Sequence, residues 1–243
     1  MTLHILGLGP GDPGLITPET LAALARAEDL VGYGPYLARI PYDPAQVRHP
    51  TDNRVELERA RHALTLAAAG RRVAVVSGGD PGVFAMASAV FEALEEGPAS
   101  WRAVDIVTLP GVSAMFAAAA RLGAPLGHDF AALSLSDNLK PWPVVLARLV
   151  AVVEAGFVVG LYNPSSRARP WQLGAAFEAL RGVLPGETVV VFATAVTRAD
   201  ERVHVTTLGE ADPGLADMRT VVLIGTRATR VVGRYVFTPR SSS

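Results

Sequence analysis

The sequence contains no cysteine, and lysine occurs once, as Lys140, among 22 basic residues. The lack of cysteine excludes disulfides, a thiolate nucleophile and cysteine-ligated metals. The formal net charge is −1 and basic residues form no run, so no long-range field attracts nucleic acid or an anionic membrane. The five histidines show no metal-ligand spacing. We therefore expect a small-molecule partner, with no nucleic acid, no membrane and no metal bound by the protein's own side chains.

Long uninterrupted hydrophobic runs are also missing. The most apolar long window, residues 144–162, contains Arg148 and Glu154, whereas a membrane helix needs about 20 apolar residues. This window is interpreted as a helix followed by a strand. No basic segment followed by a clean apolar stretch marks a signal peptide, which predicts a cytoplasmic protein.

Half of the residues are hydrophobic, enough for a sizeable core, and apolar runs alternate with helical patterns. In the first half strand and helix alternate tightly, which indicates a mainly parallel sheet. In the second half strands more often follow one another, which indicates a mixed sheet with at least one hairpin. The pattern predicts an α/β fold of two α/β domains, residues 1–110 and 111–243, with a cofactor cleft between them. The expected strands are 3–8, 29–33, 72–77, 105–109, 157–162, 188–194, 203–208 and 219–224.

The first predicted strand leads into the loop GLGPGDPGLIT, residues 7–17. Residues 9–14 fit the spacing G-x-G-x-x-G, which in dinucleotide-binding proteins presents backbone N–H groups to a pyrophosphate. Pro10 and Pro13 each lack such a donor, and Asp12 adds a negative charge where the anion would lie. The loop therefore favours a neutral or cationic ligand.

The tetrapeptide GDPG occurs at residues 11–14 and again at residues 79–82, each time after an apolar strand. Gly-Asp-Pro-Gly is an ordinary turn sequence by itself. Parallel strands, however, place the loops at their carboxyl ends on one edge of the sheet, where ligands of α/β folds bind. The pair of loops therefore predicts a ligand site that includes the carboxylate of Asp80.

These two loops and five other motifs resemble those of a known family. Motifs that resemble the tetrapyrrole methyltransferases of cobalamin and siroheme biosynthesis are GPGDP (9–13), GGDP (78–81), PGVSA (110–114) and TVVLIG (220–225). Motifs that resemble the branch methylating C17 of precorrin-3B, with ring contraction to precorrin-4, are GYGPY (32–36), SDNLKPW (136–142) and YNPSSRARPWQL (162–173). The resemblance covers nearly the whole chain. It implies the tetrapyrrole methylase fold, a homodimer, and S-adenosyl-L-methionine as the cofactor, with S-adenosyl-L-homocysteine as its product.

The resemblance also implies the cofactor contacts, carried over motif by motif. A sulfonium cation carries no phosphate, which agrees with a loop poor in N–H donors. The predicted cofactor-binding residues are Pro10, Gly78, Gly79, Asp80, Val83, Ser113, Ala114, Tyr162, Asn163 and Ala193.

Methylation at C17 and contraction of the ring require proton movement by a general acid or base. Sequence alone does not single out that group, and the candidates are Asp12, His49, Asp52, Asp137 and Lys140. Of these candidates, Asp12 and Lys140 are predicted to be catalytic, and we expect His49 to be an exposed loop residue. The acetate and propionate groups of a tetrapyrrole favour guanidinium partners. The predicted substrate-binding residues are Asp137, Asn138, Arg54 and Arg198.

Three alternatives stay open. The first is the anaerobic enzyme that acts on a cobalt-containing macrocycle, with the same type of reaction. The second is a nicotinamide-dependent oxidoreductase, which would explain the glycine spacing of the first loop but not Asp12. The third is a tetrapyrrole carrier without catalytic activity, which would not need both GDPG loops.

Overall fold

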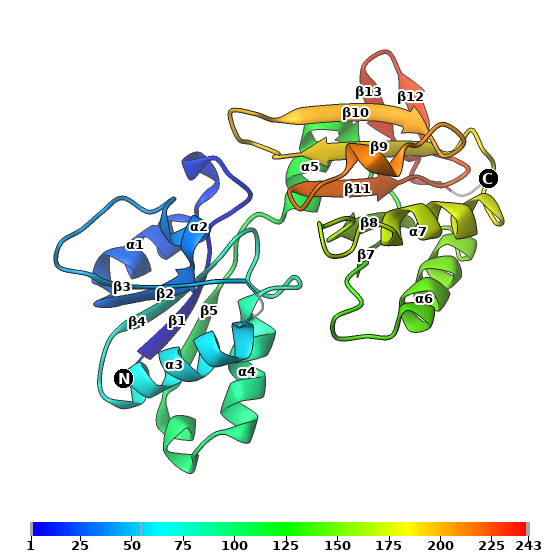
Figure 1. Ribbon diagram of the computed structural model, residues 1–243. Helices are drawn as coiled ribbons and strands as arrows, with labels where there is room; N and C mark the ends of the chain where they lie inside the picture. Colours follow the sequence, from blue (N-terminus) through cyan, green and yellow to red (C-terminus); the bar gives the residue numbers. More distant parts are fainter. Residues whose placement is uncertain (1, 54, 242–243) are drawn as a thin grey trace. The chain divides into compact units, whose positions relative to one another are not determined.

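The computed structural model describes residues 2–53 and 55–241. Arg54, one of the predicted substrate-binding residues, lies outside the described residues. The chain divides into two compact units, residues 1–113 and residues 114–243. Each unit is built on its own sheet and is described by itself (Figure 1).

The first unit contains a parallel sheet of strand order β3-β2-β4-β1-β5. Its strands are β1 (Thr2–Gly7), β2 (Asp29–Tyr33), β3 (Val47–Thr51), β4 (Val73–Ser77) and β5 (Asp105–Leu109). Its helices are η1 (Pro13–Leu15), α1 (Pro18–Arg26), α2 (Gly34–Leu37), α3 (Glu56–Ala68), α4 (Met86–Glu96) and η2 (Ala99–Ala103). The parallel sheet predicted for this half is confirmed.

Both faces of this sheet are buried, which explains why its central strands are continuously apolar. Side chains alternate between the two faces of a strand. In β4, Val73 and Val75 belong to the core under α3 and α4, whereas Ala74 and Val76 belong to the core that includes Leu24 of α1. The loops at the carboxyl ends of these strands are thereby held at one edge of the sheet.

The second unit contains a mixed sheet of strand order β10-β9-β11-β8-β7, in which β7 and β8 are parallel and the other neighbours antiparallel. Its strands are β7 (Phe130–Ser134), β8 (Val158–Tyr162), β9 (Val189–Thr194), β10 (Arg202–Thr207) and β11 (Thr220–Ile224). Its helices are α5 (Ala114–Leu122), α6 (Trp142–Glu154), α7 (Gln172–Arg181) and η3 (Pro213–Leu215). A small third sheet joins β6 (Gly123–Ala124), β12 (Arg230–Val232) and β13 (Tyr235–Phe237). The mixed sheet and the β9–β10 hairpin confirm the prediction for this half.

The core of the second unit lies between its sheet and the helices α6 and α7. Phe177 of α7 packs edge-on against Phe192 of β9, with ring centroids 6.0 Å apart. Leu149 of α6 and Leu161 of β8 are buried in the same cluster. This packing fixes the start of both helices next to the carboxyl ends of β7 and β8.

Five strands of the structure, β3, β6, β7, β12 and β13, were not among the eight expected from the sequence. His49 was expected to be an exposed loop residue, but it lies in the edge strand β3 (Val47–Thr51), which pairs with β2 over its whole length. Three of the five residues of β3 are partly buried although its sequence is polar, so periodicity could not reveal it.

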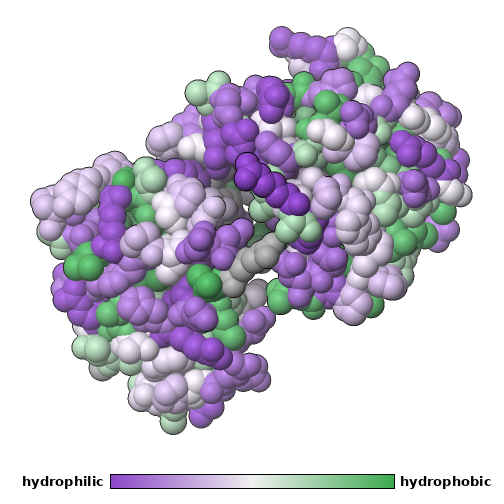
Figure 2. Space-filling model, in the orientation of Figure 1, coloured by the Kyte–Doolittle hydropathy of each residue, from purple (hydrophilic) through white to green (hydrophobic). Residues whose placement is uncertain are grey.

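Within the described ranges 2–53 and 55–241, no helix is long and apolar enough to cross a membrane. On the face shown in Figure 2, hydrophobic residues are scattered among hydrophilic ones within each unit.

Candidate functional site

Three loops of the first unit meet at glycine residues. They follow β1, β4 and β5, which are neighbours in the sheet. A Cβ on Gly111 would lie 2.3 Å from the carbonyl oxygen of Gly79 and 2.9 Å from Cα of Gly7. Gly9 and Gly79 exchange two backbone hydrogen bonds, and both have left-handed φ angles, +63° and +67°. We call Gly7, Gly9, Gly79 and Gly111 the glycine junction. A side chain at Gly7 or Gly111 would separate the loops, and the left-handed φ angles of Gly9 and Gly79 favour glycine.

The backbone of the first loop has few donors left for a ligand. Pro10 and Pro13 have no N–H group. Five backbone amides of the loop already donate within the unit, those of Leu8, Gly9, Gly14, Leu15 and Ile16. A pyrophosphate cradle needs such amides free and aimed at the anion. The geometry therefore disfavours the dinucleotide alternative.

The carboxylate of Asp80 links the second loop to the third. Its Oδ1 accepts from the amide of Gly82 at 2.8 Å, and its Oδ2 accepts from the amide of Gly111 at 3.0 Å. Asp12 accepts from Gly14 in the same local turn, also at 2.8 Å. Asp80 thus has a second role, because its side chain connects two loops of the glycine junction.

A third copy of the same turn shows how general it is. Asp212 accepts from the amide of Gly214 at 2.8 Å, at the start of η3 in the second unit. Its sequence Asp-Pro-Gly-Leu repeats that of residues 12–15. The turn by itself therefore carries no ligand-specific information, and Asp12 remains a predicted catalytic residue for which the structure describes a turn-forming role.

Sequence reasoning did not connect the side chain of Arg39 with the first loop. The guanidinium of Arg39 donates to the carbonyl oxygens of Leu8 at 2.6 Å, Gly9 at 3.1 Å and Gly11 at 3.4 Å. It thereby holds the loop backbone in a fixed shape. The distance of 28 to 31 residues along the chain explains why no local pattern revealed it.

Backbone strain gathers in the loops that the resemblance assigns to the cofactor. Among the described residues other than glycine, positive φ angles occur at Phe84, Asn163, Ala195 and Thr197. Phe84 follows the predicted contact Val83, and Asn163 is itself a predicted contact. Ala195 and Thr197 lie just after β9, where Ala193 is predicted. Such conformations cost energy and cluster at binding and catalytic sites.

In the second unit, two predicted cofactor residues stand at the carboxyl end of β8. The hydroxyl of Tyr162 accepts from the amide of Met115 in α5 at 3.1 Å. The side-chain amide of Asn163 donates to Ser134 Oγ, at the end of β7, at 2.9 Å. Ala193 differs from both, because it is fully buried inside β9 and paired with Val203 of β10 and Val221 of β11.

The remaining cofactor predictions are distributed between backbone and buried positions. Pro10 and Ser113 are buried, whereas Gly78, Val83 and Ala114 are partly exposed. A Cβ on Gly78 would lie 2.7 Å from the ring of Tyr36, so that position requires glycine. These residues remain predicted cofactor contacts.

The predicted substrate residues of SDNLKPW lie in the loop between β7 and α6. Asp137 accepts from the amide nitrogen of Gln172, with 3.2 Å to each carboxylate oxygen. Gln172 is 1% exposed and begins α7, so Asp137 anchors its loop to that helix. Asn138 is exposed and Lys140 is partly exposed in the same loop. Gln172 was not found from sequence, because nothing local distinguishes a buried glutamine.

Two tryptophans stand at the starts of α6 and α7. The rings of Trp142 and Trp171 make an edge-to-face contact with centroids 5.0 Å apart. Trp142 packs against the core, whereas Trp171 is 49% exposed. Arg198 is exposed in the loop after β9, and its amide donates to the carbonyl of Ala195 at 3.0 Å.

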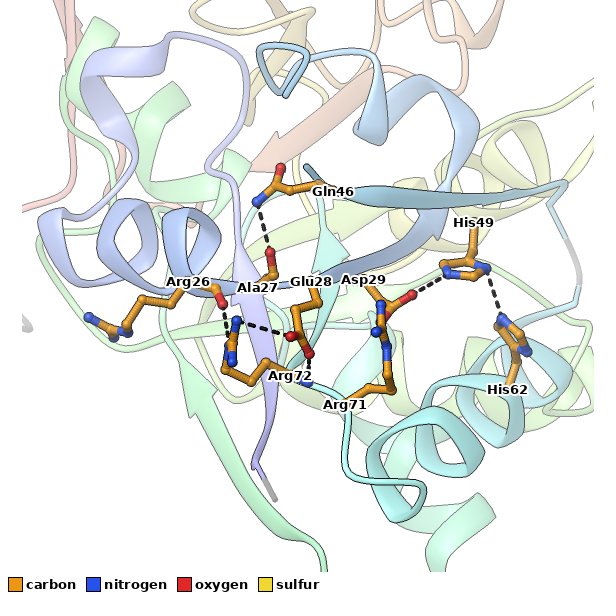
Figure 3. A network of polar contacts seen from close by, with 9 residues as sticks. All are labelled: Arg26, Ala27, Glu28, Asp29, Gln46, His49, His62, Arg71 and Arg72. Carbon is orange, nitrogen blue, oxygen red and sulfur yellow. Dashed lines mark hydrogen bonds and ion pairs between the residues drawn. The ribbon is translucent and has the colours of Figure 1, made fainter. Parts of the chain in front are cut away.

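A separate polar network lies near the amino ends of β2 and β4 (Figure 3). Asp29, only 2% exposed, accepts from Arg71 Nε at 2.7 Å and contacts His49 Nε2 at 2.8 Å. His49 Nδ1 in turn lies 3.1 Å from His62 Nε2. Burial tends to raise the pKa of Asp29, but the hydrogen bonds from Arg71 and His49 outweigh it and lower the pKa below its usual value.

This network corrects the expectation for His49. That residue is not an exposed loop histidine; it belongs to β3 and its ring is bound to a buried carboxylate. Its place in the edge strand and its bond to Asp29 assign it to the structure of the first unit. Within residues 2–53 and 55–241, no group of three or more His, Cys, Asp or Glu side chains could hold a metal ion.

Comparison with known proteins places these loops in a family context. The family model described as "Tetrapyrrole (Corrin/Porphyrin) Methylases" matches residues 2–212. The chain is 58% identical to a "Precorrin-3B C(17)-methyltransferase" from Sinorhizobium sp., covering 98% of this chain and 96% of that protein. It is 40% identical to a "Probable cobalt-factor III C(17)-methyltransferase" from Salmonella typhimurium, covering 98% of each chain.

Solved structures agree with these sequence relatives. The crystal structure of the methyltransferase CobJ superimposes with a TM-score of 0.96 at 54% identity, covering 98% of this chain and 99% of that one. A uroporphyrin-III C-methyltransferase from Thermus thermophilus, solved in complex with S-adenosylhomocysteine, superimposes with a TM-score of 0.66 at 20% identity. The alignment covers 93% of this chain and 92% of that one, and at this identity it shows a common fold alone.

Proposed function

Because this chain belongs to the tetrapyrrole (corrin/porphyrin) methylase family, we propose that it methylates C17 of precorrin-3B. The methyl donor is S-adenosyl-L-methionine, and the ring contracts to give precorrin-4 in cobalamin biosynthesis. The observation that carries this proposal is the 58% identity to a precorrin-3B C17-methyltransferase over nearly the full length of both chains.

The sequence identities also bear on the alternative of an enzyme that acts on a cobalt-containing macrocycle. Identity to the relative named for cobalt-factor III is 40%, lower by 18 percentage points over the same share of this chain. This difference favours the metal-free substrate over the cobalt-containing one. Membership of a methylase family also speaks against the oxidoreductase and the carrier without catalytic activity.

The first unit supports binding of S-adenosyl-L-methionine by backbone shape. Gly78, Gly79 and Asp80 follow β4, next to Pro10 in the loop after β1, and a cofactor there would meet backbone without intervening side chains. The first loop has few N–H groups left for a phosphate, and S-adenosyl-L-methionine carries no phosphate. When bound, the cofactor supplies an electrophilic methyl group, and the chain's task is to hold it in line with the carbon that accepts it.

Val83, Ser113 and Ala114 are proposed to contact the cofactor, as are Tyr162, Asn163 and Ala193. Strain at Asn163, at Phe84 directly after Val83, and at Ala195 two residues after Ala193 supports this assignment, since strained residues persist where surrounding contacts hold them for function. Ala193 is the weakest member on structural grounds, because it is fully buried within its strand.

On the substrate side, we propose that Lys140 moves a proton and that Asp137, Asn138 and Arg198 orient the macrocycle, with Arg54 from outside the described residues. A lysine ammonium can meet a carboxylate or release a proton, whereas a guanidinium stays charged. Asp12 is kept as the second proton-transfer candidate. A homodimer and a cytoplasmic location remain predictions, for which sedimentation and cell fractionation are the measurements.

The experiment combines binding with turnover. Calorimetric titration should show binding of S-adenosylhomocysteine and none of NADH. Incubation with precorrin-3B and methyl-labelled S-adenosylmethionine should give a labelled, ring-contracted product, with slower turnover of the cobalt-containing analogue. Binding of NADH without S-adenosylhomocysteine, or cofactor binding without methyl transfer to either macrocycle, would contradict the proposal.

A further inference from the structure

Hidden polar atoms without a hydrogen-bond partner are concentrated in one loop. In the described part of the chain, eight buried side-chain nitrogen or oxygen atoms have no partner. Four of the eight fall within the seven residues 166–172: Ser166 Oγ, Arg169 Nε, Arg169 Nη1 and Gln172 Oε1. Buried polar atoms in folded proteins are normally paired, so such a concentration calls for a physical cause.

The loop backbone is not the cause, because it is well ordered by its own hydrogen bonds. Ser166 and Arg169 exchange two backbone bonds, at 3.1 and 3.0 Å, which close a tight turn. Before the turn, Asn163 is bound to Ser134 of β7; after it, Gln172 is bound to Asp137. The turn is thus held at both ends, and only its side chains lack partners.

Arg169 is unusual among the arginines that are partly or fully buried. Arg39 and Arg59 direct their guanidinium groups at carbonyl, hydroxyl or sulfur acceptors, and Arg71 directs its group at the carboxylate of Asp29. Two of the three guanidinium nitrogens of Arg169 are hidden from water and meet no acceptor among the described residues. A charged group hidden from water is costly unless an acceptor compensates it.

We propose that the turn 166–169, between β8 and α7, binds a carboxylate of the tetrapyrrole, with Arg169 as the charged donor and Ser166 as a second donor. This inference rests on the proposed function and names a substrate contact of the same reaction. A carboxylate supplies the acceptor oxygens that the guanidinium lacks, in charge-assisted hydrogen bonds. The unpaired oxygen of Gln172 would accept from an N–H group of the same ligand.

The surroundings of the turn suit a flat, carboxylated macrocycle. Trp171, two residues after Arg169, is 49% exposed and supported from the side by Trp142. An exposed, braced indole offers a ring face next to the carboxylate donor. The loop leaves the sheet at the carboxyl end of β8, the same edge from which the loop with Asp137 and Lys140 leaves β7.

The test uses uroporphyrin I, a stable porphyrin with acetate and propionate groups, and follows its fluorescence in the presence of S-adenosylhomocysteine. Arg169→Gln should raise the Kd for uroporphyrin at least about tenfold, the loss expected for a charge-assisted contact. Arg167→Gln, an exposed arginine of the same turn, is the matched control and should change the Kd less than about twofold. Arg169→Lys keeps the charge and should fall between the two.

Stability separates ligand binding from a structural role. If Arg169 serves the ligand, Arg169→Gln removes an unpaired buried charge, so the melting temperature stays equal or rises while binding of S-adenosylhomocysteine is unchanged. A lower melting temperature with lost S-adenosylhomocysteine binding would assign Arg169 to the fold and overturn the inference. So would equal effects of Arg169→Gln and Arg167→Gln, or a parent protein that binds S-adenosylhomocysteine but no uroporphyrin. A parent protein that binds neither would instead overturn the proposed function.

Discussion

Gly9 and Gly79 hold two loops together through their backbones alone: Gly79 N donates to Gly9 O at 2.9 Å, and Gly9 N donates to Gly79 O at 3.2 Å. Both residues have left-handed φ angles, and both belong to loops that follow neighbouring strands. The third loop meets them at Gly111. The edge of the first sheet is therefore a continuous backbone surface, which explains why these loops are rich in glycine.

Gly111→Ala should disrupt this junction. The new Cβ would lie 2.3 Å from the carbonyl oxygen of Gly79, and backbone atoms cannot move aside as a flexible side chain can. We expect a loss of about 1–3 kcal/mol in the free energy of unfolding, measured by denaturant titration, and at least about tenfold weaker S-adenosylhomocysteine binding. Gly174→Ala, where the nearest atom is 3.8 Å away, is the control. Equal stability of the two variants would show that the junction tolerates side chains.

Asp80→Asn should weaken the same junction, because it changes the side chain that accepts from the amide of Gly111. An asparagine keeps one carbonyl oxygen for Gly82 but turns an amide group toward the N–H of Gly111. The expected cost is about 1–3 kcal/mol in the free energy of unfolding, with weaker binding of S-adenosylhomocysteine.

Asp212→Asn is the matched control for Asp80→Asn, because Asp212 forms the same turn and has, among the described residues, no second backbone partner comparable to Gly111. We expect its stability and cofactor affinity to stay near those of the parent. If Asp80→Asn behaved like Asp212→Asn, the contact to Gly111 would contribute nothing to the free energy of unfolding.

Asp29 should make the protein sensitive to acid. Its pKa in the folded protein is lowered from 3.8, so the stability that it contributes is fully present above this value and lost as the pH falls through the folded pKa. Asp29→Asn should lower the free energy of unfolding at pH 7 by about 1–3 kcal/mol and flatten its decrease below about pH 4. Urea titrations at a series of pH values measure both effects. Asp129→Asn, at an exposed position, should leave the pH profile unchanged; an unaltered acid limb in Asp29→Asn would contradict the assignment.

Lys140→Arg should lower turnover of the tetrapyrrole at least about tenfold, equivalent to ~1.4 kcal/mol of transition-state stabilisation. Arginine keeps the positive charge but does not release a proton, so S-adenosylhomocysteine binding and melting temperature should be unchanged. The neighbouring Leu139, which is 93% exposed, provides the control variant Leu139→Ala. If Lys140→Arg turned over the tetrapyrrole as fast as the parent, a role of Lys140 in proton transfer would be contradicted.

The local pattern of residues predicted the elements whose periodicity was clear. The strands 29–33 and 105–109 have the predicted bounds, and most others lie within one residue of them. The strands β3, β6, β7, β12 and β13 escaped prediction. In the polar strand β3, strand formation depends on pairing with β2 and not on alternation. The family resemblance likewise rested on short motifs, each of which is a continuous stretch of the sequence.

The interpretation of the loops was only partly open to sequence reasoning. Two prolines were enough to argue against a phosphate cradle, and the count of bonded amides agrees with that argument. The GDPG repeat, in contrast, suggested a similar role for Asp12 and Asp80. The structure separates them, since only Asp80 is shown holding the amide of Gly111, 31 residues away.

By itself, the sequence determined the α/β class, the parallel and mixed sheets, the family and the lack of cysteine chemistry, because all of these follow from composition, local periodicity or short motifs. The tertiary structure decided which residues meet. It brought Gly7, Gly79 and Gly111 into contact, bound Arg39 to carbonyl oxygens of the first loop and bound His49 to Asp29. It also hid two guanidinium nitrogens of Arg169, which have no partner among the described residues. The physical reason is that burial and hydrogen bonding at these positions depend on strand order and helix packing, which join segments tens of residues apart and leave no trace in the neighbouring sequence.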